Sequence, residues 1–304
     1  MTLQKCLICK SSLLNEIGLA GVKYYCCEQC KTMRLMKFPE PVYKKKYYKG
    51  NSFPASILFK PVATFFYKIR EHYTHASNIN LWIDIGAGDG DYLKIIKAKR
   101  KIGVEISDAG RKLMQETGIK TMTPKEFLAS NNLNADVISF WHVLEHMEKP
   151  WYYLQAAKRN LAPKGKIVIG VPNIESFEYK IFKNNWFHLA PKYHFWHFSV
   201  RSVKILLNST GYRVDKIDYL SVEHQTAGIL QSLINSTSNS KNVLHKLIKR
   251  GMGTEKIFTK DLVSICFWIT FGLPIVLIFW LIETILHRSG TIVVVASPTI
   301  FFQE

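Results

Sequence analysis

The sequence predicts an α/β fold built on a parallel sheet with helices on both faces. Two observations support this prediction. Strand-like and helix-like segments alternate between residues 81 and 220, and the first strand runs directly into a glycine-rich turn. Such alternation places crossover helices on the two faces of a parallel sheet. At 304 residues, the chain is long enough for one such domain and smaller additions.

Hydrophobic periodicity assigns the elements of this domain in chain order. The predicted strands cover residues 81–85, 101–106, 135–140, 166–171, 212–220 and 290–296. The predicted helices cover residues 91–98, 108–116, 150–161 and 200–209. We therefore expect the main domain to comprise residues 81–220 and 288–304, with residues 221–287 inserted before its last strand.

Five of the six cysteines lie near the N-terminus, in a zinc-ribbon-like head that we place at residues 1–38. Two CxxC pairs contribute four thiols, those of Cys6, Cys9, Cys27 and Cys30. Two close thiolate pairs can close a tetrahedron around Zn²⁺, and so small a head has little other means of holding itself together. Four protein thiolates leave no open coordination position, which makes the predicted zinc structural. Cys26 is an alternative fourth ligand, and a loop with free thiols is the alternative to a metal site.

Residues 39–80 are predicted to link the head to the main domain. Between Ile57 and Arg70, apolar residues recur at helical spacing with basic residues between them. We expect a helix that packs on the main domain. A helix lying on a membrane surface is the alternative.

The turn after Ile85 contains three glycines within five residues. Glycines allow the backbone to approach a ligand closely and to turn sharply into a helix. Asp84 lies just inside the strand end, and Glu105 lies at the end of the next strand, where an acid accepts hydrogen bonds from ribose hydroxyls. The sequence thus predicts a nucleoside-binding site.

The stretch from Asp84 to Gly90, DIGAGDG, resembles the D-x-G-x-G-x-G motif of class I methyltransferases, which bind S-adenosylmethionine (SAM). Further motifs of this family follow in order: FWHVLEH at 140–146 with Pro150, LAPKGK at 161–166 and VPN at 171–173. The resemblance implies a Rossmann-like sheet, SAM as cofactor and methyl transfer as the reaction. A zinc-knuckle head recurs in some bacterial members.

The resemblance also implies which residues contact SAM. Its amino-acid part is held by the strand end and the turn, at Asp84, Gly86, Ala87, Gly88 and Gly90. Its ribose is held by Glu105 beside Ile106, and its methionine side is lined by Trp141 and His142. The stretch from Thr121 to Pro124 lacks the acid that members often place near adenine, so no adenine contact is assigned.

Methyl transfer is an in-line displacement, and a hydroxyl acceptor must also lose a proton, which suits a histidine. The catalytic candidates are His142, Glu145, His146 and His194. The ubiquinone-pathway O-methyltransferases are similar around the first three, which we expect on adjoining faces of a helical turn. Those enzymes associate a divalent metal with their acids, but this chain has His142 where they tend to have an acid. The alternative gives Glu145 and His146 local structural roles.

A second cluster of histidines and aromatic residues lies between the fifth strand and the next helix, at residues 186–188 and 194–198. The family builds its acceptor pocket in this region, and the resemblance favours His194 as a positioning residue. The alternative is an aromatic lid whose histidines bond to the backbone.

Residues 262–286 contain one charge, Glu283, and are interrupted by Gly272 and Pro274. A 25-residue helix would cross a bilayer core of about 30 Å, but the strands on either side should join one sheet on one side of the membrane. We therefore expect two helices, 261–272 and 274–287, in a hydrophobic hairpin that dips into one leaflet. The basic stretch 241–260 would lie on anionic headgroups. An interior helix pair or a dimer interface is the alternative.

The formal net charge of +18 favours an anionic partner, either a membrane surface or nucleic acid. No apolar stretch follows Met1, so we expect no secretory signal and a location at the cytoplasmic face of the cell membrane. The expected function is O-methylation of an amphipathic acceptor that is lipid-linked, polyprenyl or part of a cell-surface glycan. An RNA methyltransferase and a non-catalytic SAM-binding scaffold are the alternatives. We expect no nucleic-acid partner, because the sequence has no stacking-platform motif.

Overall fold

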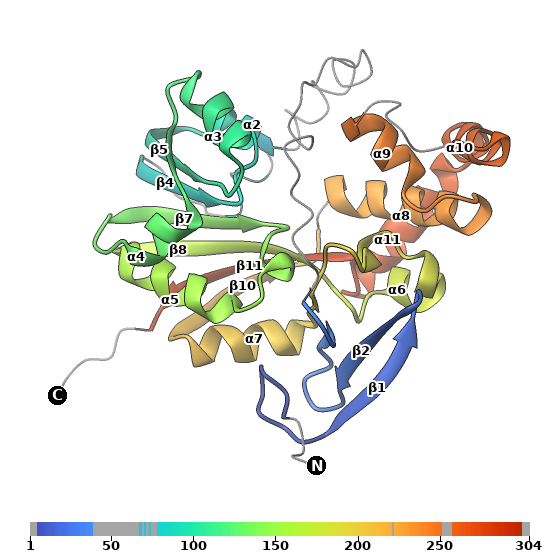
Figure 1. The fold of residues 1–304 in the computed structure, drawn as a ribbon, viewed down its shortest axis with the longest axis horizontal. Helices are drawn as coiled ribbons and strands as arrows, with labels where there is room; N and C mark the ends of the chain where they lie inside the picture. Colours follow the sequence, from blue (N-terminus) through green and yellow to red (C-terminus); the bar gives the residue numbers. More distant parts are fainter. Residues whose placement is uncertain are drawn as a thin grey trace.

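The computed structural model describes residues 5–38, 67–68, 70, 73, 78–220, 222–250 and 257–299, without the side chains of residues 222–224 and 249–250. Figure 1 shows a central sheet, a small head near the N-terminus and a helical group, α8 to α11, at one side. Most of the predicted linker 39–80, and with it most of the helix expected from Ile57 to Arg70, lies outside the described residues.

The central sheet has seven strands in the order β10–β11–β8–β7–β4–β5–β6. Their bounds are β4 (Ile79–Ile85), β5 (Ala98–Val104), β6 (Lys120–Met122), β7 (Ala135–Trp141), β8 (Leu161–Pro172), β10 (Tyr212–Asp218) and β11 (Thr291–Pro298). Strands β4 to β8 pair in parallel, whereas β11 runs antiparallel to both of its neighbours. The predicted α/β sheet is confirmed, and its last strand enters between two earlier ones.

Helices cover both faces of this sheet because successive strand residues point to opposite faces. On β4, Trp82 packs in one cluster with Tyr92 and Met114, whereas Ile83 packs in another with Leu154. The first cluster is covered by α2 (Asp91–Ile95) and α3 (Asp108–Gln115). The second is covered by α4 (Pro124–Ala129), α5 (Pro150–Asn160) and α7 (Val200–Ser209).

One predicted helix is too long, and two elements were not predicted. The helix predicted at 91–98 ends at Ile95, because Ala98 already pairs with Ile79 at the start of β5. Three basic residues, 99–101, conceal that strand start from a hydrophobicity pattern. Strand β6 and helix α4 have no counterpart in the prediction, although the cap of α4 is visible in the sequence: Thr123 and Glu126 form a capping box around Pro124.

The head contains β1 (Leu14–Leu19), β2 (Val22–Cys27) and β3 (Met33–Leu35). These strands form a four-stranded antiparallel sheet whose last member, β9 (Trp196–His197), belongs to the main domain. The head is therefore not a structurally separate unit. It shares a sheet with the segment that follows β8.

The segment between β8 and β9 contains α6 (Phe177–Phe182) and the short 3₁₀ turns η3 (Lys183–Asn185) and η4 (Phe187–Leu189). The insertion contains α8 (Val222–Thr237), α9 (Val243–Arg250), α10 (Thr259–Phe271) and α11 (Leu273–Ile285). The two helices predicted at 261–272 and 274–287 are therefore present. They do not reverse as a hairpin, because the chain bends by 70° between them and both pack on α8. We call α10 and α11 the bent helix pair.

Within the described part of the chain, no individual helix is long and apolar enough to cross a membrane. The bent helix pair passes that test only when its two helices are taken together.

The bent helix pair turns its acids toward the protein and its apolar residues toward the outside. Buried Glu283 accepts hydrogen bonds from the amides of Glu178 and Gly290, and buried Asp261 accepts from those of Asn239 and Ser240. Large exposed apolar residues cover the opposite side: Leu262, Val263, Phe267, Ile269, Phe271, Leu273, Ile275, Leu277, Ile278, Leu281 and Ile285. An ordinary surface helix in water has the opposite arrangement, with its charged side chains outward and its apolar side chains toward the protein.

Candidate functional site

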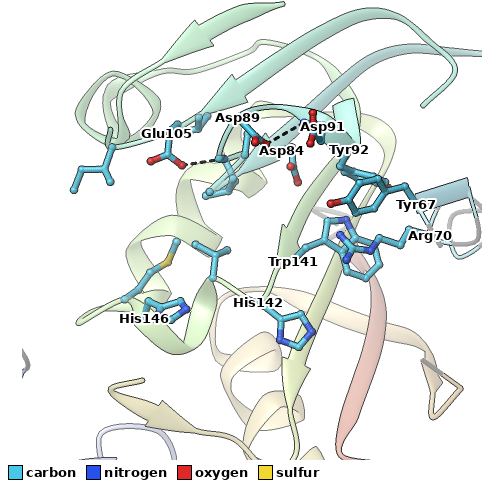
Figure 2. A pocket seen from close by; sticks show the side chains of 18 of the residues that line it. Tyr67, Arg70, Asp84, Asp89, Asp91, Tyr92, Glu105, Trp141, His142 and His146 are labelled. Carbon is cyan, nitrogen blue, oxygen red and sulfur yellow. Dashed lines mark hydrogen bonds between the residues drawn. The ribbon is translucent and has the colours of Figure 1, made fainter. Parts of the chain in front are cut away.

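A cavity of about 1440 Å³ opens at the carboxyl ends of β4, β5 and β7. This is the edge at which open α/β sheets bind ligands. The volume exceeds the roughly 300–1,000 Å³ of an ordinary ligand pocket and leaves room for a donor and an acceptor. In Figure 2, Asp84 and Glu105 lie on one side of the cavity, and His142 and His146 on the other. Predicted SAM contacts line it at Asp84, Gly86, Ala87, Gly88, Glu105, Ile106, Trp141 and His142.

The glycine turn after β4 uses left-handed backbone at Gly86, Gly88 and Gly90, with φ of 74°, 62° and 78°. A Cβ on Gly88 would meet nothing within 4 Å, so the space beside it is open. A Cβ on Gly90 would lie 2.4 Å from Cγ of Met114 instead. Gly90, predicted as a SAM contact, is thus placed against α3 and outside the cavity lining.

The Glu105 carboxylate is tied to the glycine turn. It accepts hydrogen bonds from the Gly88 amide at 3.0 Å and from the Ser107 amide at 2.8 Å. Each carboxylate oxygen can accept more than one hydrogen bond, so Glu105 can also accept from the hydroxyls of a ribose. The arrangement fits the role that the resemblance implies for Glu105.

Asp84 lies at the end of β4, where it accepts a hydrogen bond from the Ser139 hydroxyl at 2.5 Å. Burial raises the pKa of the Asp84 carboxyl to about 7, against the opposing effect of the Ser139 hydrogen bond. A cationic group in the cavity would favour the ionised carboxylate. The amino-acid part of SAM carries such a group.

Trp141 lies in an aromatic cluster that includes residues which the sequence did not indicate. The Arg70 guanidinium lies 4.9 Å from the Trp141 ring centre, and the Tyr92 ring meets Trp141 edge-on at 5.9 Å. Tyr92 and Arg70 both line the cavity. Only the fold brings these three residues together, so no local pattern could have revealed them.

His142 occupies a left-handed backbone conformation, with φ of 50°, and its amide donates to the Gly170 carbonyl at 2.9 Å. Such backbone in a residue other than glycine is costly and is concentrated at functional sites. The Nδ1 atom of His142 lies 3.5 Å from Oε1 of Glu145. Glu145 is fully buried, burial raises its pKa to about 7, and its carboxylate accepts no hydrogen bond from the described residues.

The predicted catalytic residues after β7 lie around a 3₁₀ turn, η2 (Leu144–His146), and not on an α-helical turn. His142 and His146 line the cavity, whereas Glu145 and His194 are buried behind it. Nδ1 of His146 lies 2.8 Å from the Tyr193 carbonyl, and Nδ1 of His194 lies 2.7 Å from the His188 carbonyl. A carbonyl only accepts, so each Nδ1 carries a proton and donates it to that carbonyl.

One ligand atom each from Glu145, His146 and His194 lies within 4.8 Å of the other two. A carboxylate with two imidazoles is a donor set that suits a divalent transition metal. Burial, followed by the neighbouring histidines, lowers the pKa of His194 well below its usual value, which keeps the ring neutral. Glu145, His146 and His194 can therefore hold a metal ion. Their contacts with the backbone can also fix the loop after β7.

The four thiols of the head converge as predicted. The sulfur atoms of Cys6 and Cys30 are 3.7 Å apart, and those of Cys9 and Cys27 are 3.5 Å apart. Zn–S bonds of about 2.3 Å in a tetrahedron separate the sulfurs by roughly 3.8 Å. The arrangement fits a four-thiolate zinc site, and Cys26 does not belong to the cluster.

Known proteins resemble different parts of the chain. An uncharacterized protein of Methanocaldococcus jannaschii is 35% identical over 102 residues, which are 33% of this chain. The chain matches about half, 49%, of the length of that relative. A chain in the complex of the Haloferax volcanii Trm112 methyltransferase activator with a methyltransferase is 11% identical, with a TM-score of 0.50 over 84% of this chain and 99% of that one. A SAM-dependent methyltransferase from Archaeoglobus fulgidus is 19% identical, with a TM-score of 0.46 over 78% and 93%.

The open space beside Gly88 gives a first prediction. Gly88→Ala places a methyl group in the cavity and should weaken SAM binding at least about tenfold, a loss of about 1.4 kcal/mol, in isothermal titration. Gly118→Ala is the matched control, because Gly118 also has positive φ, 77°, and nothing within 4 Å of its Cβ, but does not line the cavity. Equal affinities in the two variants would contradict the assigned SAM site.

The raised pKa of Asp84 gives a second prediction. Between about pH 6 and about pH 8 the carboxyl passes from mostly protonated to mostly ionised, so affinity for cationic SAM should rise roughly tenfold. In the free protein the same ionisation is disfavoured by burial, so the Asp84 contribution to stability falls as pH rises through about 7. Asp84→Asn should remove this pH dependence of the dissociation constant. An unchanged pH profile in the variant would show that another group is responsible.

The family assignment combines sequence and fold. Residues 67–217 match the sequence model of the family described as "Methyltransferase domain". The matched residues include the glycine turn, Glu105 and the motif after β7, which together line one face of the cavity. The sheet has the seven strands, helices on both faces and antiparallel last strand described above. Residues 67–217 therefore form a methyltransferase domain, and the sheet has the fold of the class I SAM-dependent methyltransferases.

Proposed function

We propose that this methyltransferase transfers the methyl group of SAM to a hydroxyl of an amphipathic, lipid-linked acceptor at the cytoplasmic face of a membrane. One observation carries the proposal: a single cavity joins the glycine turn to the apolar helices of the insertion. A donor site at one end and an apolar wall at the other suit an acceptor with a polar reactive end and a hydrocarbon tail.

The wall of the cavity changes character along its length. Near the sheet it is lined by charged and polar groups of the glycine turn and by His142. Toward the insertion it is lined mainly by apolar side chains from η4, α8, α9 and α10, namely Phe187, Ala227, Leu230, Leu244, Ile248 and Ile269. Gln231 and His245 are the polar groups at this end that the sequence did not indicate. Such a gradient favours a ligand that is itself polar at one end only.

The outer surface of the insertion supports a membrane partner. The exposed apolar residues of the bent helix pair form a broad surface of a kind that marks an interaction site. The acids of the pair face the protein, so none of them opposes an anionic lipid surface. Lys260 and Lys241 are both exposed, and Lys241 donates to the Asn235 carbonyl at 2.9 Å.

The residues of the cavity suit methyl transfer to oxygen. SAM, when bound, supplies a methyl group on a positively charged sulfur. His142 lies beside the SAM side of the cavity and can take the hydroxyl proton of the acceptor, with Glu145 orienting its ring through Nδ1. We also propose that the four thiolates of the head bind structural zinc, which the sulfur spacing supports.

A third prediction tests transfer. With methyl-labelled SAM and a total lipid extract, the label should enter the organic phase, and mass spectrometry should find a product heavier by one CH₂. His142→Asn should lower this transfer by about 10²–10⁴-fold while SAM still binds, because general-base catalysis contributes that much. Asn is the chosen replacement because it tolerates the left-handed backbone.

His287→Asn is the matched control for His142→Asn. His287 also has positive φ, 52°, and stacks on an aromatic ring, that of Tyr219 at 5.0 Å, but it lies outside the cavity. It should retain full transfer. Label recovered in total RNA and absent from lipid would overturn the proposed acceptor class. SAM binding without transfer to any extract would favour a scaffold.

A fourth prediction tests membrane attachment by vesicle flotation. The protein should float with vesicles of anionic phospholipid, and Phe271→Asp should weaken this partition about thirtyfold through the loss of about 2 kcal/mol of apolar burial. Phe271 is 64% exposed on the bent helix pair; Leu13, 55% exposed in the head, provides the control Leu13→Asp. Wild-type protein that stays at the bottom of the gradient, or a variant that floats equally well, would refute the attachment surface.

A further inference from the structure

The metal-ligand region of the head is bonded directly to the acceptor side of the methyltransferase domain. β3 pairs with β9, with Met33 opposite His197 and Arg34 opposite Trp196. The Leu35 amide extends the pairing by donating to the Phe195 carbonyl at 2.9 Å. The strand that follows the second CxxC pair is therefore the neighbour of the segment that carries the acceptor-side histidines.

Two side chains tighten this junction next to the thiol cluster. The Ser199 hydroxyl donates to the carbonyl of Cys30 at 2.6 Å, and the Thr32 hydroxyl donates to the carbonyl of His197 at 3.1 Å. Ser199 is also the N-cap of α7, where it accepts from the Ser202 amide at 2.9 Å. The backbone of one thiol residue thus fixes the start of a helix in the main domain.

The far side of the same segment is bonded to the loop after β7. The Phe195 amide donates to the Glu145 carbonyl at 2.9 Å, and Nε1 of Trp196 donates to the Met147 carbonyl at 2.9 Å. The Tyr193 carbonyl accepts from His146 at 2.8 Å. Residues 193–199 therefore lie between the head on one side and Glu145 and His146 on the other.

The SAM side of the cavity is held by other contacts. Asp84 is bonded to Ser139, and Glu105 to the amides of Gly88 and Ser107. Among the described residues, the hydrogen bonds from the head to the rest of the chain end on residues 184–199. Losing the head would thus remove support from one side of the cavity only.

We propose that the metal bound by the head orders residues 193–199 and so positions Glu145 and His146, while leaving SAM binding unaffected. This inference rests on the zinc ligation and the catalytic region proposed above. Besides the cysteines, the buried apolar residues of the described head are Ile8, Tyr24, Met33 and Leu35, and they pack in one cluster with the main domain. With so few buried residues of its own, the head should lose its order when a structural metal is removed. β3 then leaves β9, and residues 193–199 lose one of their two anchors.

The test compares Cys27→Ser with its neighbour Cys26→Ser in the full chain. Zinc content is measured by mass spectrometry of the metal, backbone order by hydrogen exchange and SAM affinity by titration calorimetry. Cys27→Ser should lose the metal and speed exchange in residues 193–199 at least about tenfold, a local loss of about 1.4 kcal/mol, with SAM affinity changed less than about threefold. Cys26→Ser, outside the cluster, should match the wild type in all three.

A second variant, Thr32→Val, keeps the proposal testable if Cys27→Ser fails to fold. It keeps the thiols and removes one hydrogen bond across the junction, so it should retain zinc and speed exchange in residues 193–199 about fivefold. Metal loss with unchanged exchange in these residues would overturn the coupling. Loss of SAM binding in parallel with metal loss would also overturn it, because the head would then support the whole domain. Wild-type protein without zinc would refute the metal site itself, and failure of the wild type to bind SAM would refute the proposed function.

Discussion

The hydrogen bond from the Gly88 amide to Glu105 is the contact on which the cofactor side depends. It joins the turn after β4 to the end of β5, and the amides of Gly86 and Ala87 strengthen the connection by donating to the Val104 carbonyl. α3 approaches so closely that a Cβ on Gly110 would lie 2.5 Å from the Gly88 carbonyl oxygen. Glu105 and the glycine turn are therefore oriented before a ligand arrives, which reduces the entropy lost on binding.

The acceptor side is assembled from segments that are distant in sequence. The loop after β7 contributes His142, the segment after β8 contributes Phe187, and the insertion after β10 contributes Ile269. These three strands are parallel to one another, so their carboxyl ends meet at one edge of the sheet. One edge thus gathers the polar and the apolar end of a single cavity. The outer face of the insertion continues the apolar end to the molecular surface.

Local chemistry was predictable from sequence, and long-range packing was not. The glycine turn, the position of Glu105 and the two CxxC pairs each depend on a few neighbouring residues, so their patterns are readable. The contact between Arg70 and Trp141 and the pairing of β3 with β9 depend on the finished fold. Gly90 shows the same limit. The motif indicated a sharp glycine turn there, but the position of Gly90 against Met114 depends on where α3 packs.

The division between a donor side on the sheet and an acceptor side on the additions has a chemical consequence. Asp84 and Glu105 are held by β4, β5 and β7, so changes in the head or the insertion leave their hydrogen bonds intact. His142 stands at the boundary, with strained backbone fixed by the Gly170 carbonyl and a ring that contacts both Glu145 and His188. The base proposed at this boundary thus has a fixed position relative to the proposed SAM side of the cavity. For the acceptor proposed above, η4, α8, α9 and α10 form the wall that faces its tail, so substitutions there should change which tail is accepted without changing how SAM binds.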